Sequence, residues 1–251
     1  MKLTTITLLL TALGWSQEAA PPDVAKVQAD VQRNAKILKD WANLGRYHAD
    51  NATVTAPPSG ENRVVFMGDS ITDGWGKKYG GQFFPGKPYL NRGIGGQTTP
   101  QMLIRFRPDV IAHHPKVVVI LAGTNDIAGN TGPTTLEAIE DNMMSMVDLA
   151  HENGIHVVLS SVMPVCDYIK PQTVRRPPEQ IVALNTWMKE YASTRGLVYL
   201  DYYTPMLDDK QMLKQELTFD GLHPNDAGYE IMVPLAEKAV ATALKMGKPR
   251  K

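Results

Sequence analysis

The chain has 251 residues, which is enough for one sizeable domain with a substantial core. It is 43% hydrophobic, and its 26 Lys and Arg residues balance 26 Asp and Glu residues. This formal neutrality gives no reason to expect nucleic acid or an anionic membrane surface as a partner. The single cysteine, Cys166, excludes an internal disulfide and any cysteine-rich metal site. We expect Cys166 to be a small buried residue that follows a strand.

Residues 1–16 have the pattern of a secretory signal peptide. Lys2 is followed by an apolar run from Leu3 to Leu13 and then by Gly14-Trp15-Ser16, with small residues near the end of the run. The run is shorter than the roughly 20 residues that a membrane span needs, and no cysteine follows it for lipid attachment. We therefore expect cleavage after Ser16 and a secreted or periplasmic protein without a stable membrane anchor. An uncleaved amphipathic start is the alternative.

Residues 17–62 are predicted to form an N-terminal helix and a linker. Within residues 22–50 the apolar residues recur at helical spacings: Val24, Val27, Val31, Leu38 and Trp41. Residues 51–62 have no helical or strand pattern and contain Pro57 and Pro58, which is typical of a linker. The apolar face of this helix needs a partner, and three remain open: the main domain, a second copy in a homodimer, or a role as a partial lid.

From Arg63 onward, apolar β-prone runs alternate with helical patterns. Strands are expected at residues 64–67, 89–94, 117–121, 155–162 and 197–201, and helices at 100–113, 135–153, 178–195 and 225–245. The run 117–121 is apolar throughout, which favours a central position. This alternation predicts an α/β fold: a single doubly wound, flavodoxin-like, mostly parallel sheet with helices on both faces, formed by residues 63–251 after the N-terminal helical extension.

Four polar or glycine-rich clusters follow these strands or precede a helix. They are Gly68-Asp69-Ser70, Gly95-Gly96-Gln97, Gly123-Thr124-Asn125-Asp126, and the segment from Asp220 to Asn225. Each cluster alone is compatible with ordinary turn or capping chemistry. In open α/β sheets, however, ligands bind beyond the carboxyl ends of the strands. Their coincidence at one sheet edge therefore indicates a site.

The residue types in these clusters suit acyl transfer. Ser70 is the candidate nucleophile, with His223 as its general base and Asp220 as the carboxylate that orients the imidazole. The Ser70 N–H, the Gly96 N–H and the Asn125 side-chain amide are candidate donors to an oxyanion. The spacing of Asp220 and His223 lets both side chains lie on one side of a turn. The sequence thus predicts a serine hydrolase site.

These blocks, in this order, resemble those of the SGNH (GDSL-type) esterases and lipases. The matching blocks are Gly-Asp-Ser-Ile-Thr-Asp at 68–73, glycine at 96, Gly-x-Asn-Asp at 123–126 and Asp-x-x-His at 220–223. The stretch 91–99 is similar to platelet-activating-factor acetylhydrolase subunits, and lysophospholipase-L1-like members also share the pattern. The resemblance implies the same catalytic and oxyanion roles. The Gly-x-Ser-x-Gly elbow of α/β-hydrolases is absent.

Further residues near these blocks have two readings. Asp69, Trp75 and Asp126 are candidates for the substrate pocket, and for Trp75 packing is the rival interpretation. The run 175–178, Arg-Arg-Pro-Pro, is expected to be a solvated loop at the rim of the cleft. The remaining histidines show no metal-ligand spacing, so we predict neither a metal nor another cofactor.

The predicted function is therefore a serine esterase that acts through an acyl-enzyme. No long apolar segment accompanies the site blocks, which favours short acyl groups, and export favours acetylated carbohydrate as one substrate class. A lysophospholipase or arylesterase of the same fold is the alternative. A carbohydrate-binding module without catalysis and a metal-dependent phosphoesterase, suggested by the aspartates near Ser70, are the rival classes.

Overall fold

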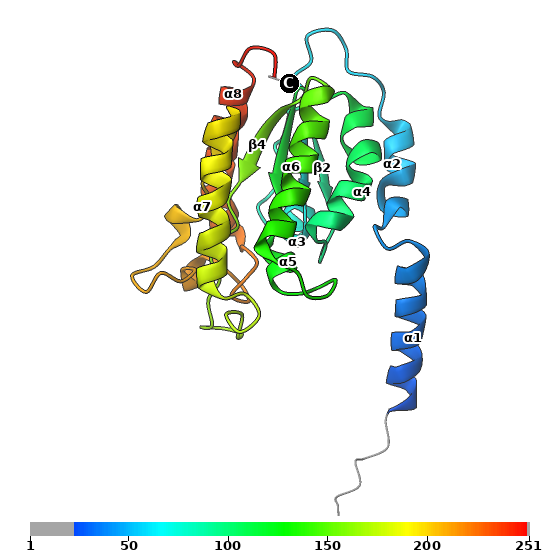
Figure 1. Cartoon of the computed structure of the whole chain (residues 1–251), viewed down its shortest axis with the longest axis vertical. Helices are drawn as coiled ribbons and strands as arrows, with labels where there is room; N and C mark the ends of the chain where they lie inside the picture. Colours follow the sequence, from blue (N-terminus) through cyan, green and yellow to red (C-terminus); the bar gives the residue numbers. More distant parts are fainter. Residues whose placement is uncertain (1–22, 250–251) are drawn as a thin grey trace, which may run out of the picture. The chain divides into compact units, whose positions relative to one another are not determined.

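The computed structural model describes residues 23–249, which divide into two compact units after Lys39 (Figure 1). The first unit contains α1 (Val24–Lys39), and the second contains the rest of the described chain. The predicted signal peptide lies outside the described residues. None of the helices between residues 23 and 249 is long and apolar enough to span a membrane.

The second unit is built on a five-stranded sheet in which every neighbouring pair of strands is parallel. The spatial order is β2-β1-β3-β4-β5, the flavodoxin-like order of a doubly wound fold. The central strand is β3, as its apolar run predicts. The strands are β1 (Val64–Gly68), β2 (Tyr89–Gly93), β3 (Val117–Leu121), β4 (His156–Ser160) and β5 (Val198–Leu200). The predicted fold class is confirmed.

Helices connect the strands, and several begin at recognisable caps. Thr135 caps α6, and Asn225 caps α8 through its side-chain oxygen. The α-helices of this unit are α2 (His48–Thr53), α3 (Ser70–Gly74), α4 (Thr99–Asp109), α5 (Thr124–Ile127), α6 (Leu136–Glu152), α7 (Pro178–Arg195) and α8 (Asp226–Ala243). Short 3-10 helices are η1 (Leu44–Tyr47), η2 (Ile111–His113), η3 (Thr204–Met206) and η4 (Gln215–Leu217).

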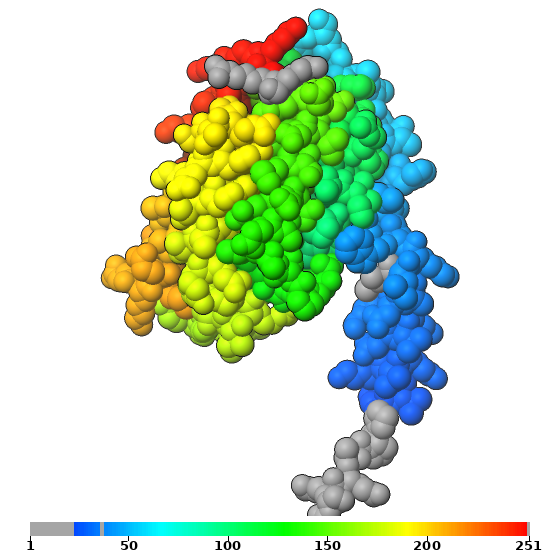
Figure 2. Space-filling model, in the orientation of Figure 1, coloured from blue at the N-terminus to red at the C-terminus, as the bar shows by residue number. Residues whose placement is uncertain are grey.

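The alternation of side chains along each strand creates a core on each face of the sheet. Val65 and Met67 of β1 belong to one core, with residues of α4, α6 and α7, whereas Val64 and Phe66 belong to the other, with residues of α8. Figure 2 shows α6 and α7 side by side over the first of these faces. Because both faces are covered, the inner strands β1 and β3 are apolar and buried throughout, whereas the edge strand β2 contains Asn91 and Arg92.

The single helix predicted over residues 22–50 is wrong. α1 ends at Lys39, and Asn43 adopts a left-handed conformation with φ of 56°. The Asp40 carboxylate accepts hydrogen bonds from the N–H groups of Leu44 (2.7 Å) and Gly45 (2.8 Å), which replaces the helical hydrogen-bonding pattern at this point. The predicted linker 51–62 also begins too early, because α2 continues to Thr53. The partner of the apolar face of α1 stays a prediction.

Residues 40–53 are anchored to the end of β2 and to the loop that follows it. The Tyr47 hydroxyl donates to the Gly93 carbonyl, and the Gln97 side-chain amide donates to the Ala42 carbonyl at 2.7 Å. The opposite end of the Gln97 side chain accepts a hydrogen bond from buried Arg105. This N-terminal segment therefore supports the loop that carries the candidate oxyanion donor at position 96.

Candidate active site

Ser70 is positioned by the turn between β1 and α3. Asp69 is the N-cap of α3, and its carboxylate accepts the N–H of Ile71 at 2.9 Å. A Cβ at Gly68 would lie 2.1 Å from the Thr72 hydroxyl, so the turn requires glycine there. Ser70 is the first residue of α3, where backbone N–H groups have no partner within the helix. Ser70 therefore lies just beyond the carboxyl end of β1, at the N-terminus of α3.

The structure brings Ser70, His223 and Asp220 into one hydrogen-bonded row. The Ser70 Oγ lies 2.8 Å from His223 Nε2, and His223 Nδ1 lies 2.8 Å from Asp220 Oδ2. Ser70 and His223 are 153 positions apart in the sequence. The side chains of His223 and Asp220 are 27% and 14% exposed, so the row is partly shielded and still accessible. These distances suit proton transfer from the hydroxyl to the imidazole.

The loop that carries His223 is held by hydrogen bonds to its backbone N–H and C=O groups. The Thr218 hydroxyl donates to the His223 carbonyl at 2.7 Å and accepts the N–H of Gly221 at 3.0 Å. Gly221 has φ of 89°, and a Cβ there would lie 2.4 Å from the Cys166 carbonyl oxygen. Cys166 is fully buried, as predicted, and its N–H donates to the Gly221 carbonyl at 2.9 Å. The segment after β4 therefore fixes the position of the histidine.

Asp220 is held as a carboxylate. Burial alone would raise the pKa of Asp220, but hydrogen bonds from the His223 N–H and imidazole and from the Leu222 N–H lower it overall. A carboxylate that faces Nδ1 fixes the orientation and tautomer of the ring, with Nε2 directed to Ser70.

The two candidate oxyanion donors from other loops lie beside this row. Gly96 has φ of 79°, a conformation that favours glycine, and its carbonyl accepts the Asn130 side-chain amide at 3.0 Å. The Asn125 amide nitrogen lies 3.1 Å from the Gln97 carbonyl and 3.4 Å from Asp69 Oδ2. Asn125 therefore bridges the loop after β2 and the cap of the nucleophile helix.

Arg176 and Asn130 orient Asn125, and the sequence analysis missed both. Arg176 is 5% exposed, so the expected solvated loop at residues 175–178 is wrong at this position. The Arg176 guanidinium reaches the Thr124 hydroxyl at 3.1 Å and the Asn125 oxygen at 3.4 Å, and Asn130 donates to the same oxygen at 3.0 Å. No local pattern identifies the Arg176 contacts, because they join loops more than 50 positions apart, whereas Asn130 lies only five positions after Asn125.

The three residues expected in the substrate pocket are buried in the surrounding structure. Trp75 is 2% exposed and packs against Phe66 and Tyr229, which supports the packing interpretation. The Asp126 carboxylate accepts the N–H and hydroxyl of Thr99 at the start of α4. Asp69 is fully buried. None of the three lines the cavity at Ser70.

That cavity has a volume of about 260 Å³ and opens beside the Ser70–His223 pair. It is lined by Ser70, Gly74, Lys78, Tyr79, Phe219, Asp220, His223 and Tyr229. The sequence analysis did not identify Lys78, Tyr79 or Phe219, which come from loops on either side of the catalytic row. Within residues 23–249 no cluster of His, Cys, Asp and Glu has the arrangement of a metal site.

Asp69 gives the protein a pH-dependent stability that can be measured. Burial raises the pKa of Asp69 to about 6 from an ordinary value of 3.8, against a hydrogen bond from the Ile71 N–H that lowers it. A raised folded-state pKa means that the folded protein binds the proton more tightly than the unfolded chain. Stability should therefore rise as the pH falls through about 6 towards 4.

We expect Asp69→Asn to remove this dependence. As the pH falls from 7.5 to 4, the free energy of unfolding of the wild type should increase by roughly 2 kcal/mol more than that of Asp69→Asn. Urea unfolding at both pH values measures the difference, with the exposed Asp209→Asn as the matched control. A gap between wild type and Asp69→Asn that does not change with pH would show that Asp69 is not the group responsible.

Comparison with known proteins agrees with the resemblance in the sequence blocks. The model of the GDSL-like lipase/acylhydrolase family matches residues 66–231. A candidate acylhydrolase from Bacteroides fragilis is 42% identical, with a TM-score of 0.78 over 82% of this chain and 99% of that chain. A GDSL-like lipase from Bacteroides thetaiotaomicron is 40% identical, with a TM-score of 0.77 over 81% of this chain and 100% of that chain.

The name of one curated relative specifies a substrate as well as a reaction. The acetylxylan esterase of Xylanibacter ruminicola is 27% identical over 239 residues, which are 82% of this chain and 47% of that protein. The chain spans between a third and about half of the length of the curated relatives it matches. The family model covers most of the second unit, and the solved Bacteroides relatives are matched over nearly their whole length. The chain therefore belongs to the GDSL-like lipase/acylhydrolase family.

Proposed function

We propose that the protein is a serine esterase that hydrolyses carboxylic esters with short acyl groups. The observation that supports this most is the row Ser70–His223–Asp220, with two contacts of 2.8 Å. A nucleophile, a base in hydrogen-bonding contact with it and a carboxylate that orients the base are the parts that acyl transfer needs. A module that only bound carbohydrate would not require this alignment.

In the proposed reaction, Ser70 Oγ attacks the ester carbonyl carbon while His223 Nε2 accepts the hydroxyl proton. The imidazolium, stabilised by Asp220, then protonates the leaving alcohol as the acyl-enzyme forms. Water enters, His223 takes one of its protons, and the resulting hydroxide attacks the acyl carbon. Collapse of this second intermediate returns the proton to Ser70 and releases the acid.

The tetrahedral oxyanion requires donors that are already in place. We assign this role to the N–H groups of Ser70 and Gly96 and to the Asn125 amide. In the present arrangement the Asn125 nitrogen has a contact of 3.1 Å to Gln97 and a longer one of 3.4 Å to Asp69. The longer contact is the weaker, and we propose that the oxyanion displaces it.

The cavity supports a small acyl group. Its volume of about 260 Å³ lies below the roughly 300–1,000 Å³ of typical ligand pockets, so a short acyl group fits it and the end of a long acyl chain would stay in solvent. The relationship to an acetylxylan esterase supports acetylated carbohydrate as the substrate class. We further propose that residues 1–16 direct export of the protein to the compartment where acetylated carbohydrates occur.

Rates on p-nitrophenyl acetate, butyrate and octanoate test the acyl preference. We expect kcat/KM to be highest for acetate and to fall roughly tenfold by octanoate, because the small cavity leaves the end of the longer chain in solvent. Ser70→Ala corrects for spontaneous hydrolysis. A maximum at octanoate would overturn the short-chain preference and favour a lysophospholipase, and activity lost on chelation would favour metal-dependent chemistry.

A further inference from the structure

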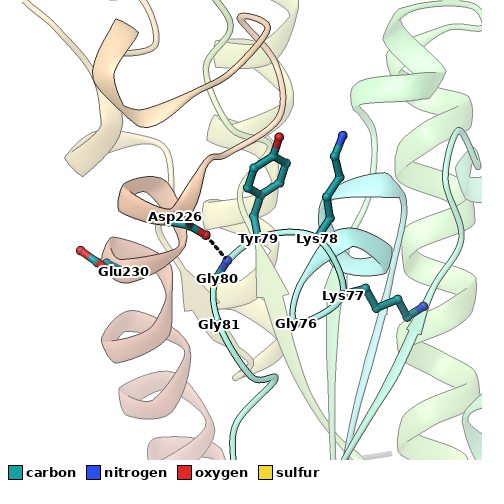
Figure 3. Close-up of a pocket in the computed structure, with 8 residues that line it drawn as sticks. All are labelled: Gly76, Lys77, Lys78, Tyr79, Gly80, Gly81, Asp226 and Glu230. Atoms are coloured by element: carbon teal, nitrogen blue, oxygen red, sulfur yellow. Dashed lines mark hydrogen bonds between the residues drawn. The ribbon is translucent and has the colours of Figure 1, made fainter.

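A second, larger hollow adjoins the cavity at Ser70. It has a volume of about 560 Å³ and lies between the loop Gly76–Gly81 and the first turns of α8, where Asp226 and Glu230 lie (Figure 3). Lys78 and Tyr79 line both this hollow and the cavity of the candidate active site. A substrate that places its ester at Ser70 can therefore extend into the second hollow past these two side chains.

The wall of the hollow is a fixed structure. The Gly80 N–H donates to the Asp226 carboxylate at 2.8 Å, which ties the loop to the start of α8 (Figure 3). Gly76 has φ of 78°, and a Cβ there would lie 2.6 Å from the backbone nitrogen of Phe83. The loop therefore holds its shape through one turn, closed by the Gly76 N–H donating to the Tyr79 carbonyl at 2.9 Å, and one contact to α8.

Aromatic rings form a continuous row from the hollow to the base. The Tyr79 ring stacks on Phe219 with centroids 4.7 Å apart, and Phe219 stacks on the His223 ring at 5.6 Å. The Lys78 ammonium lies over both the Tyr79 and Phe219 rings, 5.2 and 4.7 Å from their centroids. Tyr79 and Phe219 are half-buried. The part of such an aromatic pair that stays accessible beside a nucleophile offers a flat apolar surface on which the C–H face of a sugar ring can pack.

The charges of the hollow indicate which ligand it suits. Lys77 is paired with Asp73 at 2.7 Å, so the other charged side chains of the lining are one cation, Lys78, and two carboxylates, Asp226 and Glu230. An anionic headgroup would meet an excess of negative charge, and Lys78 already occupies the position of a cation over the rings. Neutral hydroxyl groups can both donate to the carboxylates and accept from the ammonium.

We propose that this hollow is a binding subsite for the alcohol portion of the substrate, and that its ligand is a neutral oligosaccharide. The subsite rests on the proposed esterase function, since it names the leaving group of that reaction. The sugar unit that carries the ester lies at the Ser70 cavity, and its neighbour packs on Tyr79 with hydroxyl groups directed to Glu230. Tyr79 and Glu230 then determine specificity for the alcohol.

The test compares kcat/KM for acetylated xylotriose with kcat/KM for p-nitrophenyl acetate in each variant. We expect the ratio to fall about tenfold in Tyr79→Ala and about threefold in Glu230→Ala, because the sugar substrate contacts the subsite in addition to the Ser70 cavity that both substrates occupy. Tyr79→Phe, which keeps the ring, should preserve most of the ratio. Glu237→Ala, an exposed glutamate on the same helix, is the matched control and should keep the wild-type ratio.

Binding of unacetylated xylotriose, followed by NMR titration, gives a readout that does not need catalysis. Saturable binding to the wild type that is lost in Tyr79→Ala supports the subsite. An unchanged ratio in both variants, with p-nitrophenyl acetate still hydrolysed, overturns the subsite and leaves the esterase standing. The subsite is also overturned if the variants lower kcat/KM for lysophosphatidylcholine, relative to p-nitrophenyl acetate, by the same factor as kcat/KM for acetylated xylotriose. If the wild type hydrolyses neither ester, the proposed function fails, and absence of xylotriose binding would then overturn the subsite as well.

Discussion

Ser70→Ala is expected to lower kcat for p-nitrophenyl acetate by roughly 10³–10⁵-fold. The substitution removes the only atom of the protein that we propose forms a bond to the acyl carbon, whereas the fold of α3 depends on the Asp69 cap and not on the hydroxyl. KM should change much less than kcat. Steady-state kinetics and a thermal-unfolding curve together separate loss of chemistry from loss of structure.

A fluorophosphonate provides a direct check on the same residue. It should label the wild type at Ser70, as located by peptide mapping, and should not label Ser70→Ala. Ser193→Ala, at an exposed serine on α7, is the matched control and should be labelled and active like the wild type. The double variant Ser70→Ala/His223→Ala should have nearly the same kcat as either single variant. When two residues act in the same step, removing the first already abolishes the contribution of the second. Label on another residue would refute the assignment of the nucleophile.

Asn125→Ala has the second largest expected effect, a loss of roughly 10²–10³ in kcat. The amide is aligned by Arg176 and Asn130 on its oxygen and by Gln97 on its nitrogen, so it is fixed before substrate arrives. A donor that is already aligned stabilises the developing negative charge without reorganising, which is why its removal affects kcat more than KM.

The same asparagine also links two loops, so a structural control is needed. Asn153→Ala, at the exposed end of α6, replaces an asparagine of no proposed role and should retain wild-type kcat. Inactivation by a boronic acid, which forms a tetrahedral adduct on serine, should weaken in Asn125→Ala in parallel with kcat. A variant with normal melting temperature and kcat within tenfold of the wild type would exclude Asn125 as an oxyanion donor.

The sequence predicted the strands and long helices of the second unit closely because each is defined by its own neighbours. The run 117–121 matches β3 and the pattern at 178–195 matches α7 at both ends. A parallel strand covered on both faces is apolar at every position, and Gly196, with φ of 64°, ends the helix locally. The error at residues 22–50 arose because Asp40 interrupts the helix through its side chain, which leaves the apolar spacing unaltered.

The sequence by itself determined the candidate chemistry: Ser70, Asp220 and His223 stand in short motifs whose residue types and spacing are specific. Only the tertiary structure decided what surrounds them. Arg176 reaches Asn125 across 51 positions, and Tyr79 stacks on Phe219 from the other side of the catalytic row. Such contacts depend on where the sheet brings distant loops together, and nothing in the residues next to them in the chain specifies a partner. That is the physical reason why the sequence indicates the candidate catalytic residues, whereas it gives no sign of the proposed binding surface.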